Sequence, residues 1–221
     1  MFGGRGTDFA EARREMVERQ LRGRGIHDER VLEAMAAVRR ENFVPEEVRE
    51  RAYDDGALPI GHEQTISQPW VVAAICQALG LQGGERVLEI GTGSGYSAAV
   101  LARLAAEVLS LERIPELGEG ARRALAEAGI DNVEVVVADG SRGLPDRGPF
   151  DAIAVHAATP EAPHTLLGQL QPSGTLVVPI ATGSSDLLTG FHRVNGEIRQ
   201  EVIGPCRFVP LIGAEGFGGE S

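Results

Sequence analysis

The sequence contains no lysine. All 21 basic residues are arginines, so chemistry that needs a lysine amine, such as a Schiff base, is excluded. Acidic residues number 32, and the formal net charge at pH 7 is -11. Binding to nucleic acid relies on clustered basic side chains, and the sequence has no basic stripe. We therefore expect no nucleic-acid partner.

Cysteines and long apolar runs are also scarce. Cys76 and Cys206 lie far apart and have neither CxxC nor histidine spacing, so we expect two reduced thiols and no metal site. No run approaches the roughly 18 apolar residues of a membrane helix, and the N-terminal MFGGRGTD lacks the apolar part of a signal peptide. These features predict a cytoplasmic protein without membrane contact. A chain of 221 residues forms one domain with a substantial core.

The stretch at 86–96, RVLEIGTGSGY, organises the rest of the chain. It predicts a buried strand, a tight turn with Gly91, Gly93 and Gly95, and the start of a helix, which is the first unit of a nucleotide-binding α/β fold. A dinucleotide-binding GxGxxG motif needs a third glycine where this chain has Tyr96, which disfavours an NAD-linked oxidoreductase. No GxxxxGK segment is present, so a P-loop is excluded. The GxGxG turn resembles motif I of class I S-adenosylmethionine-dependent methyltransferases.

Strands and helices are predicted to alternate along the chain. Strands are expected at 87–90, 107–111, 133–139, 150–158, 174–180, 187–194 and 197–203, and helices from Asp8 to the glycines at 23 and 25, from Asp28 to 38, and over 71–79, 115–128 and 162–170. This pattern predicts a doubly wound, mostly parallel seven-stranded sheet that ends in an antiparallel pair. We expect a disordered N-terminus at 1–7, N-terminal helices and an ordered active-site loop at 8–80, a cofactor-binding core at 81–213 and a flexible tail at 214–221.

Polar residues directly after the predicted strands are the candidate ligands, because a doubly wound fold binds its ligand there. Glu112 lies about 20 residues after Gly91, where an acid accepts hydrogen bonds from both ribose hydroxyls. Asp139 is placed to accept from an adenine amino group, with a plain turn residue as the alternative, and Gly140 would let the backbone approach the ring. His156 follows the fourth strand and is either a base or part of the pocket wall.

Five segments together resemble protein-L-isoaspartate (D-aspartate) O-methyltransferases. They are IGHEQTISQP (60–69), VLEIGTGSGY (87–96), ADG (138–140), FDAIAV (150–155) and RFVPLIG (207–213). The resemblance spans about residues 16 to 213. It implies transfer of a methyl group from S-adenosyl-L-methionine, leaving S-adenosyl-L-homocysteine, to L-isoaspartyl and D-aspartyl residues of damaged proteins, with repair through a succinimide. The expected partners are isoaspartyl-containing proteins, and we expect a monomer.

The resemblance also implies a set of site residues. Ser67 is the implied catalytic residue, Glu89, Gly91, Thr92, Gly93, Gly95, Glu112, Asp139 and Gly140 the implied cofactor-binding residues, and Thr65, Ile66, Trp70, Val209 and Leu211 the implied substrate-binding residues. Three of these have other interpretations. Ser67 could cap a helix that starts at Pro69, Trp70 could be a core residue, and the segment around Val209 could be a buried edge strand.

The chain departs from the family pattern at Glu63, where the family usually has a small residue. An inward-facing acid there would repel an anionic substrate. A relative that methylates an ordinary aspartate of a ribosomally made peptide stays open as an alternative, and a small-molecule methyltransferase is a more distant one. A non-catalytic cofactor-binding module should show damage in the 64–67 or 139–140 segments, and neither is damaged.

Overall fold

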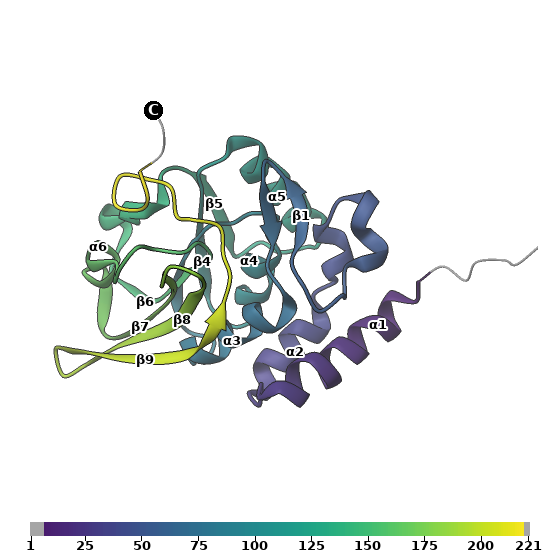
Figure 1. Ribbon diagram of the computed structural model, residues 1–221, viewed down its shortest axis with the longest axis horizontal. Helices are drawn as coiled ribbons and strands as arrows, with labels where there is room; N and C mark the ends of the chain where they lie inside the picture. Colours follow the sequence, from purple (N-terminus) through teal and green to yellow (C-terminus); the bar gives the residue numbers. More distant parts are fainter. Residues whose placement is uncertain (1–6, 219–221) are drawn as a thin grey trace, which may run out of the picture.

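The computed structural model describes residues 7–218, which form one central sheet flanked by helices (Figure 1). The seven strands follow the order β5-β4-β3-β6-β7-β8-β9. Their bounds are β3 Arg86–Ile90, β4 Glu107–Glu112, β5 Val133–Val137, β6 Phe150–Val155, β7 Leu170–Ala181, β8 Asp186–Val194 and β9 Glu197–Cys206. The first five pair in parallel, whereas β8 pairs antiparallel with both β7 and β9. The predicted doubly wound fold and its antiparallel end are confirmed.

The strand order reverses at β3, because β4 and β5 lie on one side of it and β6 on the other. In such sheets a crevice opens beyond the carboxyl ends of the strands at the reversal. Apolar side chains on both faces of β3 fix this strand at the centre, with Val87 in one core cluster and Leu88 and Ile90 in the other. The sequence therefore positions the glycine turn at the crevice.

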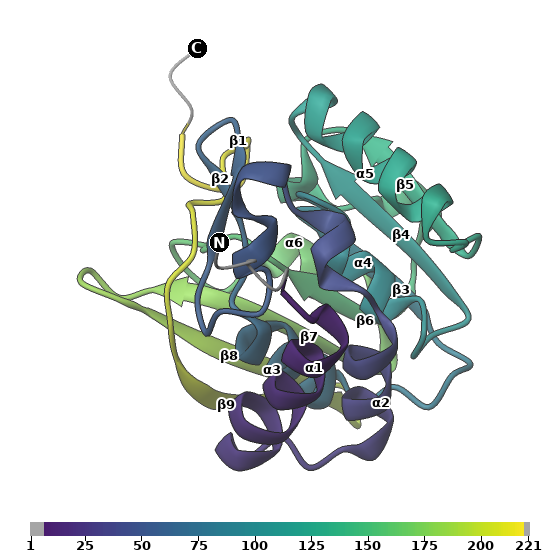
Figure 2. The same ribbon diagram turned by 90° about the vertical axis from the view of Figure 1, so that its right-hand side faces the viewer.

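Helices cover the two faces of the sheet unequally. Their bounds are α3 Pro69–Leu79, α4 Tyr96–Leu101, α5 Pro115–Glu127 and α6 His164–Leu167. The cluster that contains Val87 also contains residues of α3, α4 and α5, which lie together on one face in Figure 2, while α6 contributes Leu166 and Leu167 to the other cluster. No helix in the described part of the chain is long and apolar enough to cross a membrane.

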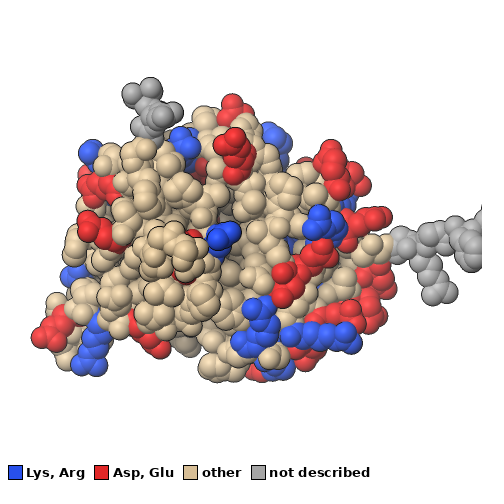
Figure 3. Space-filling view, viewed as in Figure 1, with Lys and Arg blue, Asp and Glu red and all other residues tan. Residues whose placement is uncertain are grey.

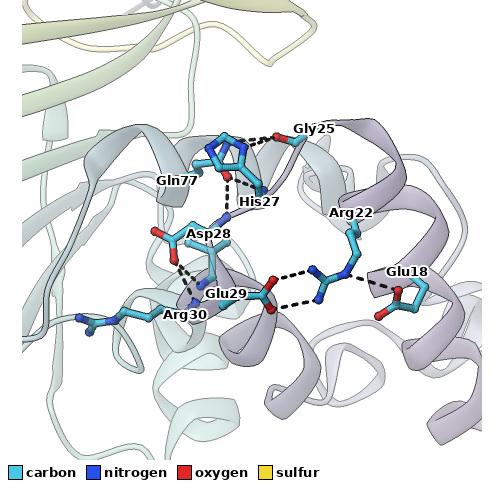
Figure 4. A network of polar contacts seen from close by, with 9 residues as sticks. Glu18, Arg22, Gly25, His27, Asp28, Glu29, Arg30 and Gln77 are labelled. Atoms are coloured by element: carbon cyan, nitrogen blue, oxygen red, sulfur yellow. Dashed lines mark hydrogen bonds and ion pairs between the residues drawn. The ribbon is translucent and has the colours of Figure 1, made fainter.

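The N-terminal helices begin at the predicted caps. Asp8 Oδ1 accepts from the backbone of the first turn of α1 (Phe9–Glu15), which continues as a π-helical turn (Met16–Leu21) and a 3-10 turn (Arg22–Arg24). Asp28 caps α2 (Glu29–Ala37) in the same way. Figure 4 shows how α3 holds this cap, because Gln77 Oε1 accepts from the backbone nitrogens of His27 and Asp28 at 2.8 and 3.0 Å. The N-terminal helices are thereby fixed to the helix that leads into β3.

The segment predicted as a loop over the cofactor contains a hairpin. After the 3-10 turns Arg40–Phe43 and Glu46–Arg51, β1 (Leu58–Gly61) pairs antiparallel with β2 (Gln64–Ile66). Gly61, His62 and Glu63 all have positive φ in the connecting turn. Strands of four and three residues are too short to be recognised in a sequence, and Pro59 and Gly61 in β1 are typical of a loop.

The chain ends in an extended segment that runs beside the hairpin at the same end of the molecule (Figure 2). Residues 207–211 are not part of β9 but pair with the chain after β6, where Ala158 N donates to Val209 O and Leu211 N donates to Ala158 O, both at 2.8 Å. Residues 214–217, expected to belong to a flexible tail, form a turn in which Phe217 N donates to Leu211 O at 2.7 Å. The predictions for 1–6 and 219–221 lie outside the described residues.

Candidate functional site

A cavity of about 380 Å³ opens at the carboxyl ends of β3, β4 and β6. Its inner wall consists of the glycine turn at 91–94, Glu112 and Gly140, and its outer wall consists of the hairpin with the following Ser67 (62–67) together with 209–212. These segments are far apart in the sequence and meet because the strand order reverses between them. The volume is within the range of small-molecule sites, roughly 300 to 1,000 Å³.

The glycine turn forms the floor of the cavity. Gly91, Thr92 and Gly93 line it, as predicted for cofactor-binding residues, and both glycines have positive φ. Gly95 does not line the cavity, and its predicted cofactor contact stays a prediction. Gly95 is the N-cap of α4 with φ 87°, and a Cβ atom there would lie 3.2 Å from the Cβ of Ala121 in α5. Its place in the motif is explained by the turn and by close helix packing.

Glu112 presents a buried carboxylate to the cavity wall. Its Oε2 accepts from Gly93 N at 2.8 Å, and its Oε1 accepts from Ile114 N at 2.9 Å. A carboxylate has about four acceptor sites, so each oxygen keeps one for a ligand. Two oxygens fixed by the backbone in this way match the paired hydroxyls of a ribose.

Gly140 and Asp139 have different surroundings. Gly140 lines the cavity, and an added Cβ would lie 2.6 Å from Ile90 Cγ2, so a larger residue does not fit there. Asp139 does not line the cavity, and its carboxylate accepts from Ser141 N and Ala214 N, each at 2.9 Å. Burial would raise the pKa of Asp139, but these two backbone donors outweigh it and lower the pKa. Asp139 therefore helps to fix two turns, and its predicted adenine contact stays a prediction.

The outer wall brings together Thr65, Ile66, Ser67, Val209 and Leu211. The Ser67 hydroxyl forms no hydrogen bond within residues 7–218, and α3 begins after Gln68 without any side-chain cap. The alternative of Ser67 as a helix cap therefore has no support in the structure. A second cavity of about 200 Å³ shares Thr65, Ser67, His156 and Val209 with the first. These four residues lie where the two cavities adjoin.

Trp70 lies away from both of these cavities. Its Nε1 donates to Arg24 O at 3.1 Å, and the Arg24 guanidinium lies 5.2 Å from the centroid of its ring. These contacts give Trp70 a packing role, and substrate binding by Trp70 stays a prediction. Trp70 fixes the 3-10 turn that follows α1 to the start of α3.

Glu89 is likewise not in the cavity wall, and its predicted cofactor contact stays a prediction. Its side chain is 0% exposed and accepts a hydrogen bond from Ser110 Oγ, and its Oε1 lies 3.3 Å from His156 Nε2. Successive residues of a strand point to opposite faces. Leu88 and Ile90 enter one core cluster, so Glu89 points into the other face, beneath the turn rather than into the cavity.

Arg40 holds part of the outer wall in place, and it was not identified from the sequence. It is 0% exposed, its Nε donates to Ala52 O at 2.7 Å, and its Nη2 donates to Ser67 O at 2.8 Å. Its guanidinium carbon lies 4.7 Å from the centroid of the Tyr96 ring. Burial lowers the pKa of Arg40. In the sequence Arg40 looks like part of a solvated arginine pair, so no pattern identifies it.

Comparisons with known proteins agree with the geometry. A family model described as Protein-L-isoaspartate(D-aspartate) O-methyltransferase (PCMT) matches residues 11–216. Protein-L-isoaspartate O-methyltransferase 1 of Rhodopseudomonas palustris (strain HaA2) is 53% identical over 213 residues, covering 96% of this chain and 87% of the relative. A solved protein-L-isoaspartate O-methyltransferase has a TM-score of 0.80 at 31% identity, over 92% of this chain and 67% of that one. A Plasmodium falciparum structure, described as a putative protein-L-isoaspartate O-methyltransferase in complex with S-adenosyl-L-homocysteine, has a TM-score of 0.79 at 26% identity, over 90% and 98%.

Proposed function

Because the chain belongs to the protein-L-isoaspartate(D-aspartate) O-methyltransferase family, we propose that it methylates the free carboxylate of L-isoaspartyl and D-aspartyl residues in damaged proteins. The observation that carries this proposal is the shared cavity. One wall has the glycine turn and the fixed carboxylate of Glu112, and the other has the free hydroxyl of Ser67. A cofactor and a carboxylate substrate can therefore meet there.

The residues present fit S-adenosylmethionine, which supplies an electrophilic methyl group on a sulfonium sulfur. Glu112 is placed to accept from the ribose hydroxyls, and the adenine ring would lie against Gly140, whose backbone packs closely against Ile90 in the cavity wall. The backbone at Gly91, Thr92 and Gly93 lines the remaining part of the inner wall. Residues 81–213 hold the cofactor in this proposal, and residues 8–80 add the substrate side.

The chain's own residues have little proton chemistry to perform. A carboxylate with a pKa near 4 is already ionised at pH 7, so no general base is needed to make it a nucleophile. The Ser67 hydroxyl and the backbone N–H groups of 65–67 would hold one carboxylate oxygen and leave the other free to attack. The hairpin and the 209–212 segment would exclude water from that oxygen. The new carbon–oxygen bond replaces the carbon–sulfur bond, and a neutral thioether leaves.

The methyl ester would then react without enzyme. Attack by the neighbouring backbone nitrogen expels methanol and forms a succinimide, and hydrolysis of the succinimide returns some normal aspartate. The alternative, methylation of an ordinary aspartate in a ribosomally made peptide, would use the same Ser67 and cofactor residues. The high identity to relatives with a repair enzyme's name over 96% of the chain favours repair.

The finer statements about partners belong to the same proposal. We expect a cytoplasmic monomer that binds flexible segments of many proteins and no nucleic acid. The net charge of -11 supports the last point, and Figure 3 shows acidic and basic side chains interspersed on the face it displays rather than a continuous basic surface. Size-exclusion chromatography with light scattering tests the monomer, and a second species at twice the mass would contradict it.

Glu112→Gln should weaken cofactor binding. The variant keeps one oxygen but replaces the other with an amide that cannot accept from a ribose hydroxyl or from the backbone. Hydrogen bonds to charged groups contribute about 1.5 to 3 kcal/mol, so we expect a Kd for S-adenosylhomocysteine roughly 10- to 100-fold higher. Calorimetry measures this Kd, and Glu116→Gln, at an exposed acid in the first turn of α5, is the matched control. An unchanged Kd would remove Glu112 from the cofactor site.

Glu63→Gly should improve substrate binding. Glu63 lines the cavity beside Ser67 and adopts φ 58°, which glycine tolerates better. An exposed charge interaction contributes up to about 1 kcal/mol, so the KM for an isoaspartyl peptide should fall roughly two- to five-fold. Glu63→Gln removes the charge and keeps a side chain at this φ, so it separates repulsion from backbone strain. An unchanged KM in both variants would show that Glu63 does not face the substrate.

The chemical nature of the product tests the proposed function. After incubation with methyl-labelled S-adenosylmethionine and an isoaspartyl peptide, the label should be on the peptide and should leave as methanol at mildly alkaline pH. A carboxyl methyl ester is labile under these conditions, whereas methyl groups on nitrogen or on an ether oxygen are not. Label that survives the alkaline treatment, or that never reaches the peptide, would overturn the proposal.

A further inference from the structure

Five polar side chains form a chain of contacts beneath the glycine turn, in a part of the core that the proposed function does not use. Thr92 Oγ1 lies 2.5 Å from Ser110 Oγ, and Ser110 Oγ donates to Glu89 Oε2. Glu89 Oε1 lies 3.3 Å from His156 Nε2, which lies 2.8 Å from Ser97 Oγ. All five residues are at most 9% exposed. The chain of contacts, here named the Glu89–His156 network, runs from the turn at Thr92 to His156 in the cavity wall.

The buried carboxylate of Glu89 lies against the imidazole of His156. Within residues 7–218, His156 is the only residue that forms an ion pair with Glu89, and Glu89 Oε1 is buried without a hydrogen-bond partner. A buried carboxylate needs a compensating cation. The thiol of Cys76, the other titratable neighbour, is neutral because burial raises its pKa. Ser97 Oγ lies 2.8 Å from the same Nε2, so two buried side chains fix the orientation of the imidazole.

The other ring nitrogen of His156 faces the cavity. Nδ1 forms no hydrogen bond with the described part of the chain, yet it is not among the buried polar atoms that lack a partner, so it is accessible. His156 lines both the main cavity and the adjoining one, opposite Ser67. A Cβ at Gly91 would lie 3.4 Å from the Cβ of His156, so the glycine turn leaves the room that this imidazole occupies.

We propose that His156 binds the carboxylate of the substrate through an N–H at Nδ1, and that Glu89 is the positioning residue that keeps the imidazole oriented. This inference rests on the proposed function and adds the group that recognises the anion. It explains how a site with acids at Glu63 and Glu112 and a protein of net charge -11 holds an anionic substrate. It also accounts for a fully buried carboxylate at Glu89 that does not line the cavity.

The test compares two peptides that differ in one group. The first has an isoaspartyl residue with a free carboxylate, and the second has the corresponding carboxamide, which cannot form the ester and is measured as a competitive inhibitor. The wild-type protein should prefer the carboxylate, measured as the Ki of the carboxamide divided by the KM of the carboxylate. In His156→Gln this preference should fall roughly tenfold, the size of one lost charged contact.

The controls separate this inference from loss of the fold and from failure of the proposed function. The Kd for S-adenosylhomocysteine of His156→Gln should match the wild type, whereas its thermal unfolding midpoint should fall because the buried carboxylate of Glu89 loses its partner. Glu89→Gln should lower the preference as His156→Gln does, and the double variant should be no worse than either; if Glu89→Gln does not fold, His156→Gln alone decides. A loosened site would weaken both peptides equally, so an unchanged preference would overturn the inference. Absence of methylation by the wild type would instead overturn the proposed function.

Discussion

Ser67→Ala is expected to lower turnover of an isoaspartyl peptide by roughly 100-fold, the usual effect of removing one positioned donor. The reason is geometric, because Ser67 is the residue of the outer wall whose hydroxyl is free and lies where the two cavities adjoin. Its carbonyl, held by Arg40, is unaffected by the change. Steady-state kinetics with labelled cofactor measure kcat and KM separately.

The same variant should keep its stability and its cofactor affinity. The Ser67 hydroxyl forms no hydrogen bond in the described part of the chain, so its removal leaves no partner unpaired. Ser184→Ala, at an exposed residue between β7 and β8, is the matched control and should leave turnover unchanged. If Ser67→Ala turns over at the wild-type rate with a normal Kd, Ser67 is only a wall residue and the assignment fails.

Arg40→Ala is expected to destabilise the protein by about 3 to 5 kcal/mol. The buried carbonyl Ala52 O and the partly buried carbonyl Ser67 O lose their donors, and an unsatisfied buried polar group costs about 1 to 3 kcal/mol. The large side chain also leaves a void beside Tyr96. Urea unfolding measures the change in the free energy of unfolding.

Arg39→Ala provides the control, since Arg39 is the exposed neighbour with the same chemistry. It should change the free energy of unfolding by less than about 0.5 kcal/mol. In folded Arg40→Ala protein, turnover should fall while the Kd for S-adenosylhomocysteine stays near the wild-type value, because Arg40 holds the Ser67 backbone and does not line the cavity. Equal free energies of unfolding for the two variants would show that the buried guanidinium of Arg40 contributes little to the stability of the protein.

The fold and the inner wall of the site could be predicted because both follow local rules. Asp8 and Asp28 are helix caps with a recognisable context, and both cap as predicted. The glycine turn follows a strand that is buried along its length, so its place at the crevice is fixed by the topology. Glu112 is the first polar residue at the end of the neighbouring strand, and its contact with Gly93 N follows from the register of β3 and β4.

The surroundings of three predicted site residues could not be foreseen, because they depend on side-chain direction or on distant contacts. Glu89 lies in the predicted strand, but its side chain points to the helix-covered face. The side chains of Leu88 and Ile90 enter the core cluster on the opposite face. Trp70 lies three residues after Ser67, yet the helix directs it toward Arg24. The carboxylate of Asp139 accepts a hydrogen bond from Ala214 N, a backbone donor from the far end of the chain. A sequence pattern gives spacing along the chain, and it does not contain these side-chain directions or long-range partners.

Two synthetic peptides of identical sequence, one with an isoaspartyl linkage and the other with a normal aspartyl linkage, test the central claim most directly. Both present carboxylates of similar charge, so only a site shaped for the rearranged backbone distinguishes them. Methyl transfer from labelled S-adenosylmethionine should be detected with the isoaspartyl peptide and be at background with its aspartyl partner. Equal labelling of the two peptides, or labelling of the aspartyl peptide alone, would contradict a repair function.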